Sequence, residues 1–284
     1  MKEKPKRILI TGASGFIGSV LYEKLSQVGC DVWGICREED ANNSKIVSAD
    51  LLSYESTYGA FLRIPHCQIL IHTAALAHSE KKSRGSNYFH INTTITKNVV
   101  SVFEAQQPYF FLLSSVAVYG EEGKYGPVKI TQELRPSTDY GMSKVHCEEI
   151  LRHSRIQKYH ILRMPPVFDE FHLKDIKKRV YFPGQSRIKM RIIPSPQYSF
   201  CHIETLSKTI LELIGKENQE PSVMNVADPQ FYNQESLIKQ FPGIEAPFPS
   251  AFLAPLYYLL CLFPKTGYSA RCFFWKLFKN SLYM

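Results

Sequence analysis

A glycine-rich stretch near the start of the chain constrains its fold most strongly. The sequence TGASGFIG, residues 11–18, directly follows the short apolar run RILIT and precedes a segment of helical apolar spacing that extends to about residue 28. Gly12 permits a tight turn, Gly15 lets the backbone approach a pyrophosphate, and Gly18 lets the helix pack closely on the strand. The free N–H groups and partial positive charge at the helix start favour phosphate. The stretch therefore predicts a strand–loop–helix unit that binds a dinucleotide.

The segments that follow alternate between strands and helices. Strand-like apolar runs occur at residues 31–36, 45–50, 68–75, 109–115 and 159–164, and helical spacing at 86–105 and 138–156. Such alternation predicts parallel βαβ units, and hence an α/β fold with a Rossmann-type doubly wound parallel sheet. After Pro165 the strands become short, with a helix predicted at 201–214 and a strand at 222–228. We therefore predict an NAD(P)-binding domain over residues 1–168 and a smaller substrate-binding lobe over 169–284, partly interleaved with the first.

The composition is that of a globular protein with a basic surface. The chain has 284 residues, 44% of them apolar and 21% charged, and a formal net charge of +8. These values permit a sizeable core and favour anionic ligands. No nucleic-acid-binding motif accompanies the charge, so we expect no nucleic acid partner. The seven cysteines are scattered without a CxxC pair or zinc spacing, so we expect reduced thiols, no metal site and a cytoplasmic location.

The apolar and aromatic stretch at residues 248–283 allows two interpretations. Its apolar run is shorter than the about 20 residues that a membrane span needs, and Pro255 interrupts it. We therefore expect no transmembrane segment. We favour a helix that packs on the substrate lobe or in a dimer, and the alternative is a peripheral contact with a membrane surface.

The end of the second predicted strand bears on the choice between NAD and NADP. An acidic residue at this place binds the ribose hydroxyls, whereas an arginine accommodates a 2′-phosphate. Arg37 stands here and favours NADP slightly, although Glu38 or Glu39 could reach the ribose from a shifted loop. Asp50, after the third predicted strand, is placed to meet the adenine, or else caps the helix that follows Leu51.

A tyrosine and a lysine in one predicted helix form the candidate catalytic site. Tyr140 and Lys144 are four residues apart, so their side chains share one face of the helix. A lysine ammonium beside a phenol favours the phenolate, and such a tyrosine can exchange a proton with a sugar or alcohol hydroxyl while hydride moves between substrate and cofactor. Ser115 ends the fifth predicted strand, where the ligand crevice of open α/β sheets lies, and its hydroxyl can hold the reacting oxygen.

These features occur in the order of a known family. The chain resembles the extended short-chain dehydrogenase/reductase family, in its NAD-dependent epimerase/dehydratase branch, over about residues 7–168, with weaker matches to about residue 228. The stretches that carry the resemblance are TGASGFIG, ADL, HTAALAH, INTTITKNVV, LLSSVAVYG, YGMSK and LRMPPVF, followed by FCHIETL and MNVAD.

The resemblance implies roles for particular residues. It makes Ser115, Tyr140 and Lys144 the catalytic triad, and gives Asn92 a supporting position that helps to order the lysine through solvent. Two alanines would line the cofactor cleft, and a Pro-Val pair would lie near the nicotinamide. The residues implied in binding NAD or NADP are Gly12, Gly15, Phe16, Ile17, Gly18, Arg37, Asp50, Leu51, Ala74, Ala75, Tyr140, Lys144, Pro166 and Val167.

The resemblance also implies a nucleoside-diphosphate sugar as substrate, polysaccharide biosynthesis as the setting and a homodimer as the assembly. Dehydration across C5 and C6 of a sugar needs an acid and a base that Val116 and Ala117 cannot supply, so a dehydratase is disfavoured. Two reactions stay open: epimerisation by transient C4 oxidation, which the branch favours, and NADPH-dependent reduction of a 4-keto sugar, which Arg37 favours. A non-catalytic NAD(P)-binding regulator is a third alternative, but such proteins typically lose the tyrosine or the lysine.

The densest basic run, residues 174–191, falls where the substrate lobe should meet a diphosphate. Arginine and lysine pair well with phosphate oxygens, but the spacing of this run singles out no residue. Asp169 and Glu170 stand where the family often has Gly-Pro, so the lobe is expected to differ near this point. The loose candidates for the diphosphate contact are Lys178, Arg179, Arg187, Lys189 and Arg191.

Overall fold

The computed structural model of the chain describes residues 5–38, 40, 42–77, 88–120, 126–216, 220–253 and 280–283. Most of the stretch 248–283, for which the sequence leaves two interpretations open, lies outside these described residues. The helices are α1 (Phe16–Gln27), α2 (Tyr54–Arg63), α3 (Tyr88–Phe103), α4 (Asp139–Arg152), α5 (Lys174–Val180), α6 (Ile203–Gly215) and α7 (Gln234–Lys239), with 3-10 turns η1 (Glu104–Gln106), η2 (Val116–Tyr119) and η3 (Ser250–Leu253). The strands are β1 (Arg7–Thr11), β2 (Asp31–Cys36), β3 (Ile46–Ser48), β4 (Ile69–His72), β5 (Tyr109–Ser115), β6 (Tyr159–Met164), β7 (Val167–Phe168), β8 (Ile188–Ile193), β9 (Gln197–Tyr198), β10 (Cys201–His202), β11 (Ser222–Asn225), β12 (Tyr232–Asn233) and β13 (Ile244–Pro249).

The chain divides into two compact units that interleave along the sequence. The first comprises Met1–Val118, Thr138–Arg163 and Ser207–Met224, and the second Tyr119–Ser137, Met164–Leu206 and Asn225–Met284. The chain thus passes between the units several times, whereas the sequence shows only one change of rhythm, near Pro165.

A seven-stranded sheet forms the centre of the first unit. Its strand order is β11-β6-β5-β4-β1-β2-β3, and β1 pairs in parallel with both β2 and β4. The pairs β2–β3 and β4–β5 are parallel as well. The order of the strands along the chain reverses between β1 and β4, which is where doubly wound sheets bind their ligands. The predicted α/β fold with a Rossmann-type doubly wound parallel sheet is confirmed.

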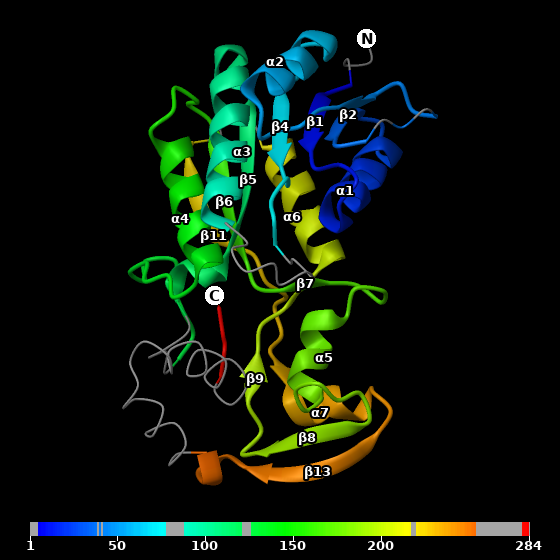
Figure 1. Cartoon of the computed structure of the whole chain (residues 1–284), viewed down its shortest axis with the longest axis vertical. Coiled ribbons are helices and arrows are strands. Elements are labelled where there is room, and N and C mark those ends of the chain that lie inside the picture. Colours follow the sequence, from blue (N-terminus) through cyan, green and yellow to red (C-terminus); the bar gives the residue numbers. More distant parts are fainter. Residues whose placement is uncertain are drawn as a thin grey trace. The chain divides into compact units, whose positions relative to one another are not determined.

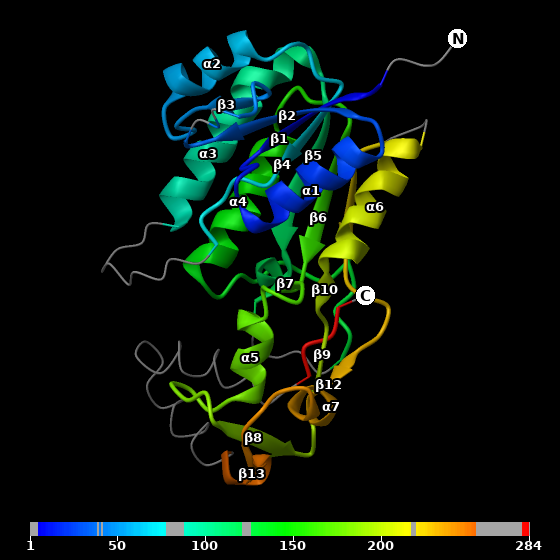
Figure 2. The ribbon, with the colours of Figure 1, turned by 90° about the vertical axis from the view of Figure 1, so that its right-hand side faces the viewer.

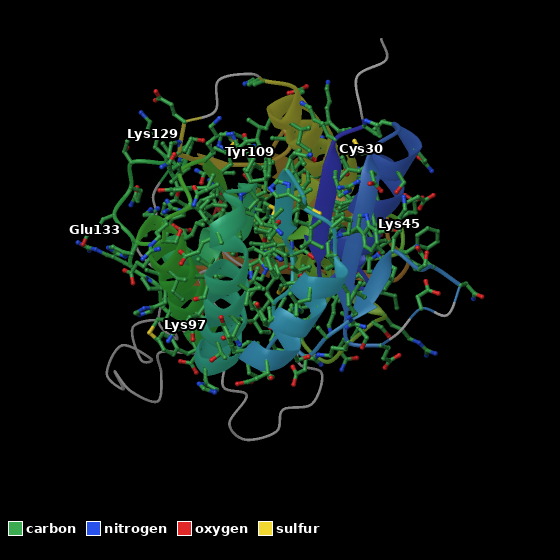
Figure 3. All side chains as sticks on the ribbon, turned by 90° about the horizontal axis from the view of Figure 1, so that it is seen from above. Cys30, Lys45, Lys97, Tyr109, Lys129 and Glu133 are labelled. Atoms are coloured by element: carbon green, nitrogen blue, oxygen red, sulfur yellow. The ribbon has the colours of Figure 1, made fainter. Side chains whose placement is uncertain are left out.

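Helices cover both faces of this sheet, which explains its continuous apolar strands. α2, α3 and α4 lie on one face, and α1 and α6 on the other (Figures 1 and 2). All four residues of β4 and the first six of β5 are buried, as expected for parallel strands in a sheet that helices cover on both faces. The side chains fill the space between the layers, with Tyr109 inside and Lys97 on the outer side of α3 (Figure 3).

The second unit is built on three short two-stranded pairings. These are β7–β10, β9–β12 and β8–β13. The helix predicted from residue 201 begins only at Ile203, because Cys201 and His202 pair with β7. Likewise the strand predicted at 222–228 ends at Asn225. The core of the unit gathers aromatic and aliphatic side chains, among them Val180, Tyr198, Phe200, Leu237 and Ile238.

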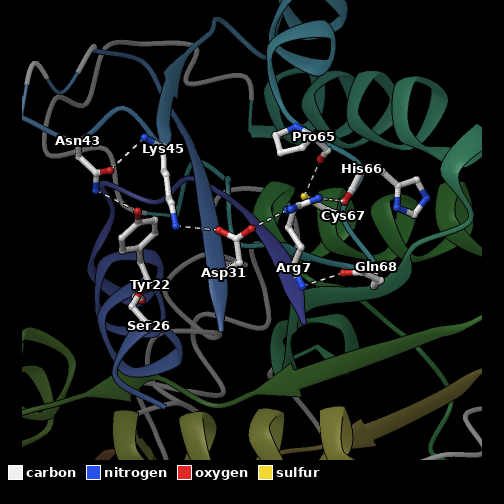
Figure 4. Close-up of polar contacts among 10 residues, drawn as sticks. All are labelled: Arg7, Tyr22, Ser26, Asp31, Asn43, Lys45, Pro65, His66, Cys67 and Gln68. Atoms are coloured by element: carbon white, nitrogen blue, oxygen red, sulfur yellow. Dashed lines mark hydrogen bonds and ion pairs between the residues drawn. The ribbon is translucent and has the colours of Figure 1, made fainter. Parts of the chain in front are cut away.

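A charged cluster joins the amino-terminal ends of the strands, opposite the ligand crevice (Figure 4). Asp31, at the start of β2, accepts hydrogen bonds from Lys45 at 2.8 Å and from Arg7 of β1 at 2.7 Å. Arg7 also donates to the carbonyl of His66, just before β4, at 3.1 Å. The hydrogen bonds from Lys45 and Arg7 hold the pKa of Asp31 below its ordinary value of 3.8.

We expect Asp31→Asn to lower the free energy of unfolding at pH 7 by at most about 1 kcal/mol, since the pair is partly exposed. The pKa of Asp31 is lower in the folded state than in the unfolded state. The ionised carboxylate therefore stabilises the fold above pH 3.8, and this stabilisation is lost as the pH falls further. Urea denaturation at pH 7 and pH 3 should therefore show the difference between variant and wild type shrinking in acid. Glu133→Gln breaks the exposed pair with Arg135 and serves as a control with a smaller effect. If the difference in free energy of unfolding between Asp31→Asn and wild type grew in acid, the lowered pKa of Asp31 would be contradicted.

Candidate functional site

The glycine loop packs so tightly at Gly12 and Gly18 that side chains would not fit there. Gly12 has φ +75°, a conformation that favours glycine, and its N–H donates to the carbonyl of Ile35 at 2.8 Å. A Cβ atom on Gly12 would lie 2.8 Å from Cα of Ala74, in the segment after β4. The loop is therefore held against the carboxyl ends of its two neighbouring strands.

The start of α1 suits an anionic group. Gly15 precedes the helix in an extended conformation, and the first turn contains no acidic residue. The first N–H groups of a helix have no intrahelical partner, and they point out with the positive end of the helix dipole. Phe16 and Ile17 form this first turn and are half-buried. The loop and the helix start thus suit the pyrophosphate of a dinucleotide, and this contact stays a prediction.

We expect Gly18→Ala to weaken both folding and cofactor binding. A Cβ at Gly18 would lie 2.2 Å from the carbonyl oxygen of Gly12, so the loop would have to move. Overpacking of this kind costs about 1–3 kcal/mol or more. The matched control is Gly59→Ala in α2, where a Cβ meets nothing within 4 Å, and which should stabilise by about 0.5–1 kcal/mol. Urea denaturation and titration with NADH and NADPH measure both effects, and equal results for the two variants would contradict the packing argument.

The ends of β2 and β3 carry the residues predicted to meet the adenosine. Arg37 directly follows β2, its side chain is exposed, and its carbonyl accepts from Ser48 Oγ at 2.9 Å. Asp50 is exposed beyond the end of β3, and Leu51 is buried. The alternative interpretation of Asp50 as the cap of the next helix is wrong. Ser53 caps α2 by accepting from Ser56 N–H at 3.1 Å, whereas Asp50 accepts from the N–H of Leu52.

Asn92 holds the segment that follows β4. Its Oδ1 accepts from the N–H of Leu76 at 2.7 Å, and its Nδ2 donates to the carbonyl of Leu76 at 3.2 Å and to Ser143 Oγ at 3.0 Å. Ala74 and Ala75, predicted to line the cofactor cleft, are half-buried in this segment. The buried amide of Asn92 therefore ties the segment to the helix that carries the tyrosine and lysine.

Helix α4 places Tyr140 and Lys144 on one face, as the spacing predicts. Thr138 caps the helix by accepting from Gly141 N–H at 3.0 Å, which puts Tyr140 in the first turn. Lys144 is only 6% exposed, and its Nζ lies 5.9 Å from the centre of the Tyr140 ring. The ring also meets Tyr88 edge-on, with 6.2 Å between the ring centres. The phenol is therefore fixed beside a buried ammonium.

Strand β5 adjoins this helix at the carboxyl end of the sheet. Lys144 Nζ donates to the carbonyl of Leu113 at 2.9 Å, two residues before Ser115. Ser115 is the last residue of β5, is half-buried, and accepts from Ala117 N–H at 3.2 Å. The structure thus brings the ends of β5 and α4 together, while the roles of Ser115, Tyr140 and Lys144 in catalysis stay predictions.

Two buried polar groups at this site were not predicted from the sequence. Glu148, one turn after Lys144, is fully buried and accepts from Ser114 Oγ at 2.6 Å, from Arg163 at 2.9 and 2.6 Å, and from Arg152 at 3.0 Å. The second group is His72, the last residue of β4. Glu148 reads as an ordinary surface charge in the sequence, and only its spacing of four from Lys144 could have placed it on the inner face of the helix.

Other predicted residues belong to the second unit. Pro166 accepts from Cys201 N–H at 3.1 Å and Val167 pairs with Cys201, so both are fixed to β10. Their proximity to the nicotinamide stays a prediction.

The basic candidates of the second unit separate into two kinds. Arg179 is buried, with its guanidinium 5.3 and 5.1 Å from the ring centres of Tyr198 and Phe200, and Lys189 is buried with its Nζ 3.2 Å from the carbonyl of Ile238. These two residues serve the core of the unit. Lys178 pairs with Asp175, and Arg187 and Arg191 are exposed. The exposed arginines therefore remain the better candidates for a diphosphate.

The doubly wound sheet, the glycine loop and the tyrosine–lysine pair define the extended short-chain dehydrogenase/reductase class. A family model described as "NAD dependent epimerase/dehydratase family" matches residues 8–227, and the chain belongs to this family. The resemblance seen in the sequence is confirmed. The family is one of NAD(P)-dependent enzymes, so the predicted enzyme class and the nicotinamide dinucleotide cofactor are confirmed at the level of the family.

Individual relatives agree with this assignment. The UDP-glucose 4-epimerase of Vibrio cholerae is 26% identical over 155 residues, which are 53% of this chain and 47% of that protein. The chain spans about half the length of the curated relatives that it matches.

Solved structures share the fold. WbmH of Bordetella bronchiseptica, in complex with NAD+, has a TM-score of 0.69 and 17% identity, over 87% of this chain and 91% of that one. The dTDP-4-dehydrorhamnose reductase of Bacillus anthracis, in complex with NADP, has the same TM-score and identity, over 88% and 87% of the two chains.

Proposed function

We propose that the protein is an NAD(P)-dependent epimerase that acts on a nucleoside-diphosphate sugar by transient oxidation at C4. The observation that carries the proposal is the buried ammonium of Lys144 one helical turn from the half-buried phenol of Tyr140. The similarity to a UDP-glucose 4-epimerase supports the substrate class. This similarity extends over about half of each chain, so the substrate is part of the proposal.

The residues of the chain account for the proton transfers. A bound nicotinamide supplies the hydride acceptor and donor. Tyr140, whose ring centre lies 5.9 Å from the Lys144 ammonium, removes the proton of the C4 hydroxyl through its phenol oxygen and later returns it. Lys144 is itself held by the Leu113 carbonyl, so its ammonium stays beside the ring. Ser115 Oγ, at the end of β5, holds the reacting oxygen.

A second candidate function is an NADPH-dependent 4-keto-sugar reductase. The observation that favours it is the exposed Arg37 directly after β2, where a 2′-phosphate would lie. In this reaction Tyr140 donates a proton once and the cofactor leaves oxidised.

Two measurements on the purified protein separate the candidates. The first denatures the protein and identifies any released nucleotide. The second follows UDP-glucose and UDP-galactose interconversion, and NADPH oxidation with a 4-keto nucleotide sugar. Retained NAD⁺ with interconversion supports the epimerase, and an NADPH-preferring site with keto-sugar reduction supports the reductase. Cofactor binding without turnover of nucleotide sugars would overturn both and favour the regulator.

We expect Arg37→Ala to weaken NADPH binding about tenfold and to leave NADH binding nearly unchanged, because a hydrogen bond to a charged group is worth about 1.5–3 kcal/mol and solvent exposure reduces this. Fluorescence titration with each cofactor measures the effect. Lys97→Ala removes an exposed positive charge on α3 and is the matched control. Equal losses for both cofactors would contradict a 2′-phosphate contact.

The location and assembly of the protein are also part of the proposal. We propose a cytoplasmic homodimer that acts in polysaccharide biosynthesis, on the resemblance to the family. Across the residues that the structure describes, no helix combines the length and apolar character needed to cross a membrane.

A further inference from the structure

A chain of buried hydrogen bonds crosses the interior of the first unit. Thr11 Oγ1 lies 2.7 Å from His72 Nδ1, and His72 Nε2 lies 3.1 Å from Thr96 Oγ1. Thr96 Oγ1 donates to Cys147 Sγ at 3.1 Å, and Cys147 Sγ donates to the carbonyl of Asn92 at 3.4 Å. Each of these five residues is at most 2% exposed. The chain therefore joins β1, β4, α3 and α4 without contact with water.

The same chain continues to the backbone of the candidate catalytic tyrosine. The Asn92 amide donates to Ser143 Oγ at 3.0 Å, and Ser143 Oγ donates to the carbonyl of Tyr140 at 2.8 Å. At its other end, Thr11 is the residue directly before Gly12 of the glycine loop. The two ends are thus the two parts of the site that must keep a fixed separation, the cofactor loop and the proton-transfer residue.

The donors and acceptors fit one direction only. A carbonyl accepts, so the Cys147 thiol donates to Asn92, and its sulfur takes the proton of the Thr96 hydroxyl. With its proton used, Thr96 accepts from His72 Nε2–H, and His72 Nδ1 then accepts from the Thr11 hydroxyl. A neutral imidazole protonated on Nε2 satisfies every link.

The surroundings of His72 favour this neutral form. Burial, and secondarily the charge of Lys144, lowers the pKa of His72 to about 3. The ring therefore stays neutral throughout the physiological pH range, and the direction of the hydrogen bonds does not change.

We infer that His72 is a positioning residue, which through Thr96 and Cys147 holds helix α4 and its Tyr140 at a fixed distance from the glycine loop. This inference rests on the proposed function of Tyr140. β4 lies between β1 and β5 at the switch point, so its last residue can bond to the loop strand on one side and to the helix layer on the other. A misplacement of about 1 Å at a reacting group can cost 10²-fold in rate, which is the effect that such a link prevents.

Two substitutions interrupt the series of hydrogen bonds. His72→Leu removes both ring nitrogens, but it also disturbs the core and can prevent folding. Thr96→Val is nearly isosteric and removes only the hydroxyl that joins His72 to Cys147. Thr96→Ser restores the hydroxyl. The matched control is Thr57→Val in α2. Thr57 is fully buried, and its hydroxyl donates to the Ser53 carbonyl at 2.7 Å, a hydrogen bond that does not belong to the series through His72.

We expect Thr96→Val to lower kcat about 10- to 100-fold with KM changed less than about threefold, and Thr96→Ser to recover most of the rate. Thr57→Val should cost comparable stability in urea without the loss of kcat. Unchanged kcat in Thr96→Val, or an equal loss in Thr57→Val, would overturn the inference.

Magnetic resonance gives readouts that do not depend on turnover. In ¹⁵N-labelled protein, His72 should be protonated on Nε2 and not on Nδ1. In ¹³C-tyrosine-labelled protein, the Tyr140 signal, assigned by its loss in Tyr140→Phe, should move in Thr96→Val and not in Thr57→Val. Should the wild type turn over no nucleotide sugar, the proposed function fails, and the Tyr140 signal still decides the positioning role. A His72 proton on Nδ1 or an unmoved Tyr140 signal would refute it.

Discussion

Tyr140→Phe is expected to lower kcat by about 10²- to 10⁴-fold, the range that a positioned general acid–base contributes. The substitution removes only the hydroxyl. The phenylalanine ring can still meet Tyr88 edge-on and lie beside the buried ammonium of Lys144. Folding and cofactor binding should therefore survive, with the free energy of unfolding within about 0.5 kcal/mol of wild type. Turnover of the substrate identified for the wild type, together with cofactor titration, measures both parts.

The control for this prediction is Tyr58→Phe, which removes a phenol hydroxyl from an exposed position on α2. It should leave kcat unchanged. Lys144→Met provides a second check, because it removes the ammonium and leaves the carbonyl of Leu113 without its donor, so both kcat and stability should fall. Activity of Tyr140→Phe close to that of the wild type would show that another group transfers the proton, and the proposed mechanism would fail.

The part of the fold that could be predicted from the sequence is the part with strong local signals. The strand β1 follows from an apolar run, and the loop follows from glycines where a side chain is excluded, by a positive φ at Gly12 and by close packing at Gly18. The shared face of Tyr140 and Lys144 follows from helical geometry alone. These features depend on residues close together in the chain, so the sequence is sufficient.

The unpredicted parts depend on contacts between distant residues. The pairings β7–β10 and β9–β12 involve two residues per strand, too few to show an alternating pattern. The burial of Arg179 and Lys189 could not be predicted, because a run of basic residues normally indicates a face exposed to solvent. Glu148 meets Arg163 only because β6 lies beside β5 under α4, a relation that sequence periodicity does not encode.

Glu148→Ala is expected to lower the free energy of unfolding by about 3–5 kcal/mol, because removing one partner of a buried ion pair leaves the other charge uncompensated. Glu148 is fully buried and Arg163 is 3% exposed. Both oxygens of Glu148 are used, Oε1 by Ser114 and Arg163 and Oε2 by Arg152 and Arg163. Urea denaturation at pH 7 measures the loss. Glu149→Ala, at the adjacent exposed position, is the control and should cost less than about 1 kcal/mol.

A double-mutant cycle separates the ion pair from simple packing. If the carboxylate matters chiefly as the partner of Arg163, the double substitution Glu148→Leu with Arg163→Leu should cost less than the sum of the two single changes, by about 1–3 kcal/mol. A loss below about 1 kcal/mol for Glu148→Ala, or strict additivity in the cycle, would contradict the ion pair.

The ion pair of Glu148 and Arg163 lies next to the candidate catalytic residues. Glu148 follows Lys144 by one helical turn and bonds to Ser114, the neighbour of Ser115. Arg152 and Arg163 pair with the Glu148 carboxylate, and its hydrogen bonds hold α4 to β5 and β6 beside the residues that we propose transfer the proton.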